Sequence, residues 1–252
     1  MSGLAYICGY GYGSNSDESD CEYVPIDRKR QKLPTPDLSK VSIVPQDEHV
    51  DDPELHGGRS RSFPHVRGNW ATFIYIKYLE GELQNLVDKL QTATSFIDNS
   101  CQKCKDIHVS LSRTVVLTYH LITPFSISIQ TALKNVESFE LGFDSVKVYC
   151  NEEKTRTFIA LKADCASNQY LQKITKIVDE VLLEYKLEPF YEDPSFHMSI
   201  LWVNGNKQKE LTTIIQDLNH IVAEEIGRSL KSVLVNKLHC KSGNKHFQYF
   251  LE

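Results

Sequence analysis

Two nearly identical motifs, each inside an apolar run, constrain the fold of this chain more than any other feature of its sequence. HVSLS begins at His108, and HMSIL begins 89 residues later at His197. In a β-strand successive side chains point to opposite faces, so each histidine shares a face with the serine two residues on. If the two strands lie side by side, His108, Ser110, His197 and Ser199 converge on one surface with an apolar core behind it.

The order of elements around the motifs predicts two similar halves, because each motif strand follows a strand and then a helix. Apolar periodicity and β-branched content define these elements. The predicted helices are 80–97, 124–138, 167–186 and 207–225, and the other predicted strands are 71–79, 144–150, 155–162, 233–240 and 247–251. We therefore predict an α+β fold of two lobes, whose two antiparallel sheets face one another across a central cleft with helices on the outside.

The first 55 residues differ in composition from the rest. They are rich in Gly, Ser, Asp, Pro and Glu and have few periodic apolar positions, which predicts disorder. Residues 1–60 hold 11 acidic and 6 basic side chains, which accounts for the net charge of −5 of the 252-residue chain. We expect an acidic, disordered region at 1–55 and a two-lobed domain at 56–252. The basic cluster Arg28–Lys32 is either a weak nuclear-import signal or a solvated charge run.

The remaining composition indicates a soluble intracellular protein. The N-terminus lacks the pattern of a secretory signal, and no segment approaches the roughly 20 apolar residues of a membrane helix. Seven scattered cysteines, an odd number, argue for a reducing compartment. Cys101 and Cys104 form a CxxC, but without a second pair at zinc spacing it is interpreted as a solvent-facing turn.

Two histidines on one surface suit a reaction that removes a proton from one atom and delivers one to another. With an ordinary pKa near 6.5, one imidazole can be neutral while the other is charged. The neighbouring serines can donate hydrogen bonds to the non-bridging oxygens of a phosphoryl group. RNA fits this arrangement because its own 2′-OH is the nucleophile. Since such a reaction needs no metal, and the sequence offers no carboxylate-rich cluster, we predict neither metal nor cofactor.

The paired motifs resemble those of the 2H phosphoesterase superfamily. Over residues 56–252, five segments in the same order resemble, within it, the U6 small nuclear RNA phosphodiesterases: HGGRSRSFPHVRGNWAT, HVSLSRTVVL, VKVYCNEEKTRTFIAL, FYEDPSFHMSILW and CKSGNK. The resemblance implies a nuclear 3′-to-5′ exoribonuclease that trims the oligouridine tail of U6 RNA without metal. The product end is a 2′,3′-cyclic phosphate or a 3′-phosphate.

The family's functional residues carry over onto matching positions of this chain. The resemblance implies that His108, Ser110, His197 and Ser199 are catalytic. It also implies that Tyr191, in FYEDPSFH, stacks on a nucleobase, although a core position for this ring is a second interpretation. Which histidine is the base stays open.

Several other side chains have two interpretations each. Phosphate contacts and ordinary packing or solvation both fit a set of basic residues: Arg59, Arg61, Arg67, Lys154, Arg156, Lys241 and Lys245. His239 and His246 lie in the same C-terminal stretch as the last two lysines. Trp70 and Trp202 lie in apolar strands, and we predict that both are core residues.

Two other functions remain open from the sequence. One is a non-catalytic RNA-binding splicing factor, and the other is a 2H cyclic phosphodiesterase acting on small cyclic nucleotides. We expect RNA as the partner, no membrane association and a monomer, whereas protein partners and the strength of the uridine preference are left open.

Overall fold

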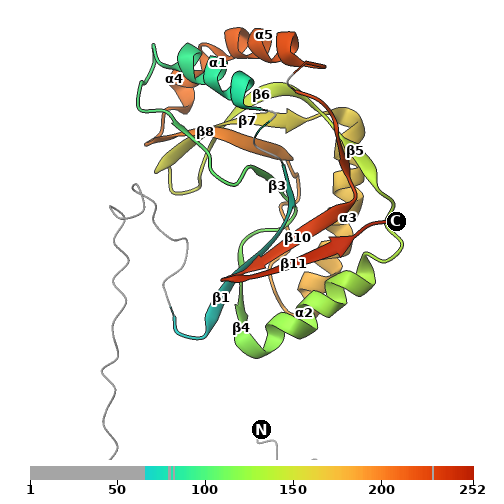
Figure 1. The fold of residues 1–252 in the computed structure, drawn as a ribbon. Coiled ribbons are helices and arrows are strands. Elements are labelled where there is room, and N and C mark those ends of the chain that lie inside the picture. Colours follow the sequence, from blue (N-terminus) through green and yellow to red (C-terminus); the bar gives the residue numbers. More distant parts are fainter. Residues whose placement is uncertain (1–65, 79–80, 82, 229) are drawn as a thin grey trace, which may run out of the picture. The chain divides into compact units, whose positions relative to one another are not determined.

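The structure, a computed structural model, describes residues 66–78, 81, 83–228 and 230–252 (Figure 1). The predictions made for 1–55, for the basic cluster Arg28–Lys32, and for Arg59 and Arg61 lie outside these residues and stay predictions. Within the described part of the chain, no helix combines the length and the apolar character that a membrane span requires.

One antiparallel sheet of nine strands joins the two halves of the described chain. Its strands run in the order β11-β10-β1-β3-β8-β7-β6, with β4 beside β1 and β2 beside β8. Their bounds are β1 Asn69–Lys77, β2 Gln102–Lys103, β3 His108–Ser110, β4 Val115–Thr118, β6 Phe143–Cys150, β7 Arg156–Ala163, β8 His197–Asn204, β10 Lys237–Ser242 and β11 Lys245–Phe250. The α+β class is confirmed, and the two predicted sheets are joined where the motif strands β3 and β8 pair.

Two short strands form a separate sheet, and the sequence predicted only the second of them, as the start of strand 233–240. They are β5 (Phe139–Leu141) and β9 (Val233–Val235), which pair antiparallel. The predicted strand 233–240 is accordingly divided between β9 and β10, because Asn236 separates the two. β5 and β9 have three residues each, which is too short for a clear alternation of apolar and polar side chains.

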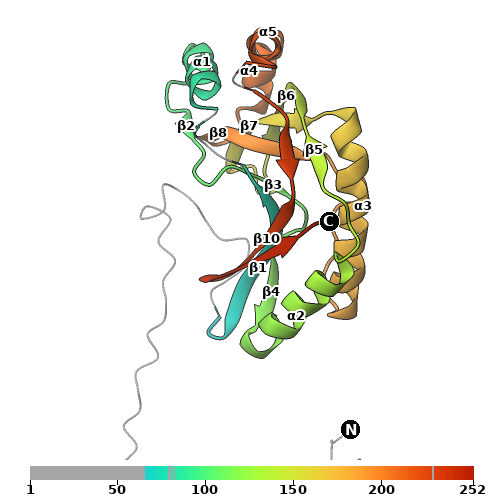
Figure 2. The same cartoon turned by 45° about the vertical axis from the view of Figure 1, so that its right-hand side comes forward.

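The helices form two groups. α1 (Gln84–Thr94), α4 (Gln208–Thr212) and α5 (Ile215–Glu225) lie with β6, β7 and β8, whereas α2 (Tyr119–Ala132) and α3 (Cys165–Glu184) lie with β4, β5 and β11 (Figures 1 and 2). The predicted helix 207–225 is two helices, because a turn at Thr213 and Ile214 separates α4 from α5.

The prediction of a helix starting at Pro124 is wrong in its start. α2 begins at Tyr119 and contains Pro124 in its interior. Proline lacks an N–H and therefore cannot bond the carbonyl of His120, which normally costs about 3 kcal/mol. The helix continues because Ile122 and Phe125 are both buried in the core, and this tertiary packing outweighs the lost bond.

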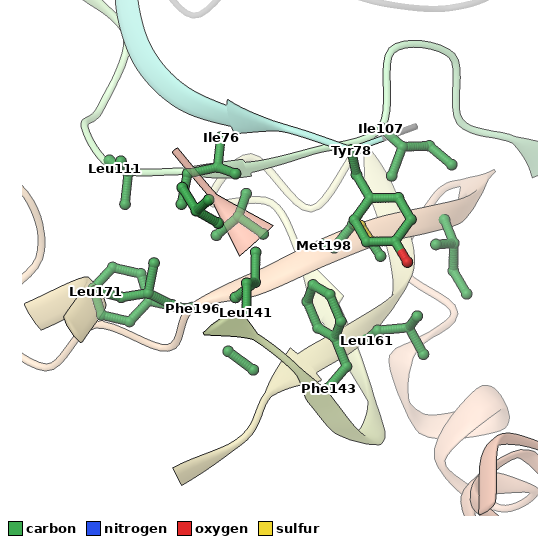
Figure 3. Packing of buried hydrophobic residues seen from close by; sticks show 14 of the residues in the cluster. Ile76, Tyr78, Ile107, Leu111, Leu141, Phe143, Leu161, Leu171, Phe196 and Met198 are labelled. Carbon is green, nitrogen blue, oxygen red and sulfur yellow. The ribbon is translucent and has the colours of Figure 1, made fainter. Parts of the chain in front are cut away.

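The apolar residues of the two motifs lie in the main core. Val109 pairs with Met198 across β3 and β8, and both side chains are buried. Figure 3 shows Met198 in this cluster with Tyr78 and Phe143. Burying a side chain of this size stabilises a protein by about 1.5–3 kcal/mol. The apolar side chains therefore fix which face of each strand points inward, and with it the opposite face.

The CxxC is not the solvent-facing turn that we predicted. Cys101 is buried and Cys104 is partly buried, and the two residues between them form β2, which pairs with β8. The carbonyl of Cys101 also accepts a hydrogen bond from Gln91 Nε2 at 2.8 Å. Among the described residues, no group of three or more His, Cys, Asp or Glu side chains is arranged to hold a metal. The segment is an edge strand that extends the sheet beyond β3.

Replacement of Gly142 by Ala should destabilise the fold through the N-cap of α3. Asp164 caps this helix by accepting a hydrogen bond from the Ser167 N–H at 2.7 Å, and a Cβ on Gly142 would overlap the Asp164 carboxylate. We expect Gly142→Ala to lower the free energy of unfolding by about 0.5–2 kcal/mol, the usual value of such a cap. Urea denaturation measures it. Gly81→Ala is the control, since no atom lies near a Cβ there, and equal stability of both variants would contradict the expectation.

Candidate active site

The four motif side chains share one face of the sheet, which we call the histidine face. Val109 and Met198 pair on the buried side, so the antiparallel register sets His108 beside Ser199 and Ser110 beside His197. All four side chains are partly exposed. The structure thus brings together the two histidines and two serines that the sequence singled out, from positions 89 residues apart.

Both imidazoles are oriented by the same kind of contact with the backbone. Nδ1 of His108 lies 2.6 Å from the carbonyl oxygen of Asp106, and Nδ1 of His197 lies 2.6 Å from that of Ser195. In each case the acceptor is two residues earlier in the chain. Because a carbonyl can only accept, Nδ1 carries the proton in both rings. Nε2 is then the nitrogen that exchanges a proton, a lone pair in the neutral ring and a donor in the charged one.

Tyr149 fixes the second imidazole in place. Its ring stacks on His197 with centroids 3.8 Å apart and an interplanar angle of 18°. Its hydroxyl lies 2.7 Å from Ser195 Oγ, in the residue whose carbonyl contacts His197. Ala160, cross-strand neighbour of Ser199, carries no side chain beyond Cβ and is fully buried. The tyrosine therefore holds both the ring and the backbone that orients it.

The environment of His197 favours its neutral form. Burial lowers the pKa of His197, and the positive charges of Lys147 and His108 lower it further, whereas the hydrogen bond to the Ser195 carbonyl acts in the opposite direction. A histidine with a lowered pKa is a better candidate for a general base at neutral pH than for an acid.

The flank beside His108 is aromatic and basic. The Tyr75 ring lies edge-on to His108, with centroids 5.3 Å apart, and stacks on His239 at 5.4 Å. Tyr75 pairs with Ser110 on one side and His239 on the other, so all three share the histidine face. Burial lowers the pKa of His239, and the charges of Lys237, Lys77 and His246 add to this effect. The motif search did not predict this third histidine because it carries no serine partner.

The candidate site is a set of side chains on a sheet face, and it does not coincide with a pocket of about 510 Å³ elsewhere in the structure. The pocket is lined by Gly142, Phe143, Asp164, Ile226, Gly227, Leu230, Lys231 and Ser232. No motif residue is among them, so this pocket is separate from the histidine face.

Comparisons with known proteins identify relatives of this chain. A family described as HVSL, an uncharacterised conserved protein, matches residues 31–249. U6 snRNA phosphodiesterase 1 of Mus musculus is 38% identical over 94% of this chain and 96% of the mouse protein, and that of Drosophila melanogaster is 36% identical over 98% and 99%. The chain belongs to the U6 snRNA phosphodiesterase 1 family. The resemblance inferred from the five sequence segments is confirmed, and with it the prediction of an enzyme of the phosphodiesterase class.

Solved structures support the predicted fold of this U6 snRNA phosphodiesterase 1 family member. Usb1 of Kluyveromyces marxianus superimposes with a TM-score of 0.53 at 15% identity, covering 75% of this chain and all of the yeast protein. A second structure of that protein, with uridine monophosphate, gives a TM-score of 0.51 at 17% identity. The chain shares its fold with Usb1, and the predicted α+β class is confirmed.

Tyr191 is a surface residue in this family member. Its side chain is 47% exposed, so the interpretation as a core residue is wrong. The Arg113 guanidinium lies over the ring, 4.1 Å from its centroid. The position that the resemblance assigned to base stacking is therefore accessible. Arg113 comes five residues after His108 and was not predicted, because a single arginine after a strand carries no pattern.

The prediction that Trp202 is a core residue is wrong, and a β-bulge is the reason. Ile159 pairs with Leu201 but Ala160 pairs with Ser199, so Ile200 is an extra residue in β8. The bulge reverses the alternation, and Trp202 lies partly exposed on the histidine face. The Arg156 guanidinium lies 4.0 Å above its ring. Trp70, in contrast, packs against the core as predicted.

The other basic candidates are divided between the histidine face and the periphery. Lys241 lies on that face, opposite Phe73 in β1. Lys245 instead lies 4.3 Å from the Tyr119 ring centroid. Lys154 is exposed in the turn between β6 and β7, and Arg67 is exposed before β1.

Removal of the Tyr149 ring should raise the pKa of His197. Tyr149→Ala exposes the imidazole to water, and burial is the largest cause of its lowered pKa. NMR titration of the histidine ring protons of both proteins measures the shift. Tyr149→Phe retains the stacked ring and should shift the pKa of His197 less. An unchanged pKa in Tyr149→Ala would show that the ring does not shield His197.

Proposed function

We propose that this chain is a 3′-to-5′ exoribonuclease that trims the oligouridine tail at the 3′ end of U6 small nuclear RNA. The proposal rests first on membership of a family whose members in mouse and Drosophila carry the name U6 snRNA phosphodiesterase 1. Uridine monophosphate in the Kluyveromyces marxianus Usb1 structure supports uridine as the preferred nucleotide. A nuclear location and action as a monomer on RNA complete the proposal.

The observation that carries this function is the matched orientation of two imidazoles on paired strands. Each Nδ1 contacts a backbone carbonyl at 2.6 Å, which leaves each Nε2 to exchange a proton. General acid and general base catalysis each accelerate a reaction by roughly 10²- to 10⁴-fold. Two such groups side by side serve a reaction in which one oxygen loses a proton and another gains one.

Transesterification at the last phosphodiester fits these two groups. We assign His197 as the base, because its lowered pKa keeps it neutral, and it accepts the proton of the penultimate 2′-OH. That oxygen attacks the adjacent phosphorus, the bond from phosphorus to the 5′-oxygen breaks, and His108 protonates the departing oxygen. The RNA is left with a 2′,3′-cyclic phosphate. Water, with the two histidines in exchanged roles, can open this ring to a 3′-phosphate.

The serines and lysines balance the charge of the phosphoryl group. Ser110 and Ser199, each beside the histidine of the other motif, are placed to donate hydrogen bonds to the non-bridging oxygens. Lys77 pairs with His108, and Lys162 pairs with His197, and both lysine side chains are exposed. Their charges favour the RNA backbone, whose binding should weaken as salt rises. In this scheme the chain's own side chains supply every proton transfer, and no cofactor takes part.

Tyr191 is proposed to hold a nucleobase. The ring is exposed in the loop just before β8, six residues from His197. A base stacked on an aromatic ring contributes about 1–3 kcal/mol and tolerates different bases, since each has a π-face. Arg113, stacked on the same tyrosine, adds a positive charge where a phosphate would follow.

An RNA ending in several uridines tests the function directly. We expect release of terminal nucleotides from the 3′ end, unaffected by excess EDTA. A matched RNA whose penultimate ribose is 2′-deoxy should resist loss of its last nucleotide, because it lacks the nucleophile. Product analysis by mass spectrometry should detect the cyclic phosphate or the 3′-phosphate.

Three other outcomes would replace this function. Efficient cutting of the 2′-deoxy RNA would indicate an activated water instead of the 2′-OH. Tight binding of RNA without any cleavage would support a non-catalytic splicing factor. Opening of a free 2′,3′-cyclic nucleotide alone would support a small-molecule cyclic phosphodiesterase.

Replacement of either histidine should abolish most of the activity. His108→Ala and His197→Ala should each reduce kcat/KM on the uridine-tailed RNA by at least about a hundredfold, since each removes one proton transfer. The double variant should lose less than the product of the two effects, because the histidines act as a unit. His220→Ala, on α5, is the control and should be unaffected. Near-normal turnover by either single variant would contradict the two-histidine mechanism.

A further inference from the structure

Two arginine–aromatic stacks flank the histidine pair, one on each side along the chain of β8. Arg113 lies over Tyr191, six residues before His197, and Arg156 lies over Trp202, five residues after it. The distances from guanidinium carbon to ring centroid are 4.1 and 4.0 Å. The two stacks are thus chemically alike, and only the first has a proposed ligand.

The second stack lies on the histidine face. Ala160 and Ser199 are a directly opposed pair, and Phe158, two residues from Ala160, shares its face and pairs with Trp202. Arg156, two residues further, is on this face as well. From Ser199 to Trp202 the strand advances by about 10 Å or less, at roughly 3.3 Å per residue. The tryptophan is therefore within about 10 Å, along the strand, of a ligand bound at the motif serines.

The surroundings of Trp202 are aromatic and basic in the way a base-binding surface requires. Phe158 pairs with Trp202 in β8 and with Tyr149 in β6, so three rings stand in one row across the sheet. Trp202, Phe158 and Arg156 are all partly exposed. A cation over a tryptophan is held by about 0.5–2 kcal/mol, so the flat guanidinium is already oriented. Unpaired RNA bases stack on aromatic rings and on arginine planes alike.

We propose that the Arg156–Trp202 stack is a second nucleobase subsite, and that it binds the base on the opposite side of the scissile phosphate from the base on Tyr191. The inference rests on the proposed function, since it assigns both bases of the dinucleotide that the histidines cut. The ligand is a single-stranded RNA base, bound by stacking, with the arginine charge near the backbone. The subsite recognises the flat face of a base through the Trp202 ring and the RNA backbone through the Arg156 charge, so it accepts different bases.

Removal of a base from the substrate and of a ring from the protein tests the pairing between them. Three RNAs with the same uridine tail are compared: one intact, one lacking the base of the last nucleotide, and one lacking the base of the penultimate nucleotide. Ribose and phosphates are the same in all three. The quantity measured is kcat/KM for release of the last nucleotide by the wild type, Trp202→Leu and Tyr191→Ala.

We expect Trp202→Leu to lower kcat/KM on the intact RNA by roughly five- to a hundredfold. On one of the two base-deleted RNAs the variant should equal the wild type, because the stacking partner is already absent. On the other it should show its full loss. Tyr191→Ala should give the reverse pattern with the same two RNAs.

Two further variants separate binding from folding. Arg156→Lys retains the positive charge but loses the planar guanidinium group. This variant should lose activity on the same RNAs as Trp202→Leu, and its melting temperature should be unchanged. Tyr170→Leu is the matched control, an exposed ring beneath Lys173 on α3, and should behave as the wild type on all three RNAs.

Two results would overturn the subsite. One is an equal loss by Trp202→Leu and Arg156→Lys on every RNA, which makes the stack a structural element of the sheet. The other is coupling of Trp202 and Tyr191 to the same base. A wild-type protein that trims the tail but shows either result rejects the subsite alone, whereas a wild-type protein that releases no nucleotide rejects the proposed function and the subsite together.

Discussion

The pairing of β3 with β8 is the interaction on which the candidate site depends. Val109 and Met198 meet on the buried side of the sheet, and their burial requires His108 and His197 to point the other way. The same pairing joins the strands of the two halves into one sheet. The pairing of these two strands therefore sets the register of the histidines, so the arrangement of the site follows from the burial of the apolar face.

The two histidines are alike in their backbone contacts and different in their surroundings. Each Nδ1 faces a carbonyl two residues earlier, a similarity that follows from the repeated motif. Beyond this the halves differ: His197 lies under Tyr149, whereas His108 meets the edge of Tyr75. Burial and nearby positive charge lower the pKa of His197, which suits it to the role of base in the proposed mechanism.

Periodic patterns in the sequence predicted the faces and approximate bounds of several strands and helices, but few of the contacts between them. His-x-Ser in apolar runs predicted the faces of β3 and of β8 as far as Ser199. Apolar periodicity predicted the approximate bounds of β6, β7 and α3. The start of α2 was missed because burial of Ile122 and Phe125 overrides the preference of Pro124 for a first turn. Tyr149 was missed for another reason: its partner His197 is distant in sequence, and no spacing signals a stacked ring.

The bulge at Ile200 divides β8 into two segments whose alternation differs in phase. Before it, odd-numbered residues such as His197 and Ser199 lie on the histidine face, and after it the even-numbered Trp202 and Asn204 do. The histidine pair and the aromatic stack therefore lie on the same face of the sheet, although the bulge gives the two segments different registers. A gain or loss of one residue at this point would exchange the side chains presented beyond it and leave the histidines in place. Under the proposed function, such a strand allows the residues of the second subsite to change while the two histidines keep their register.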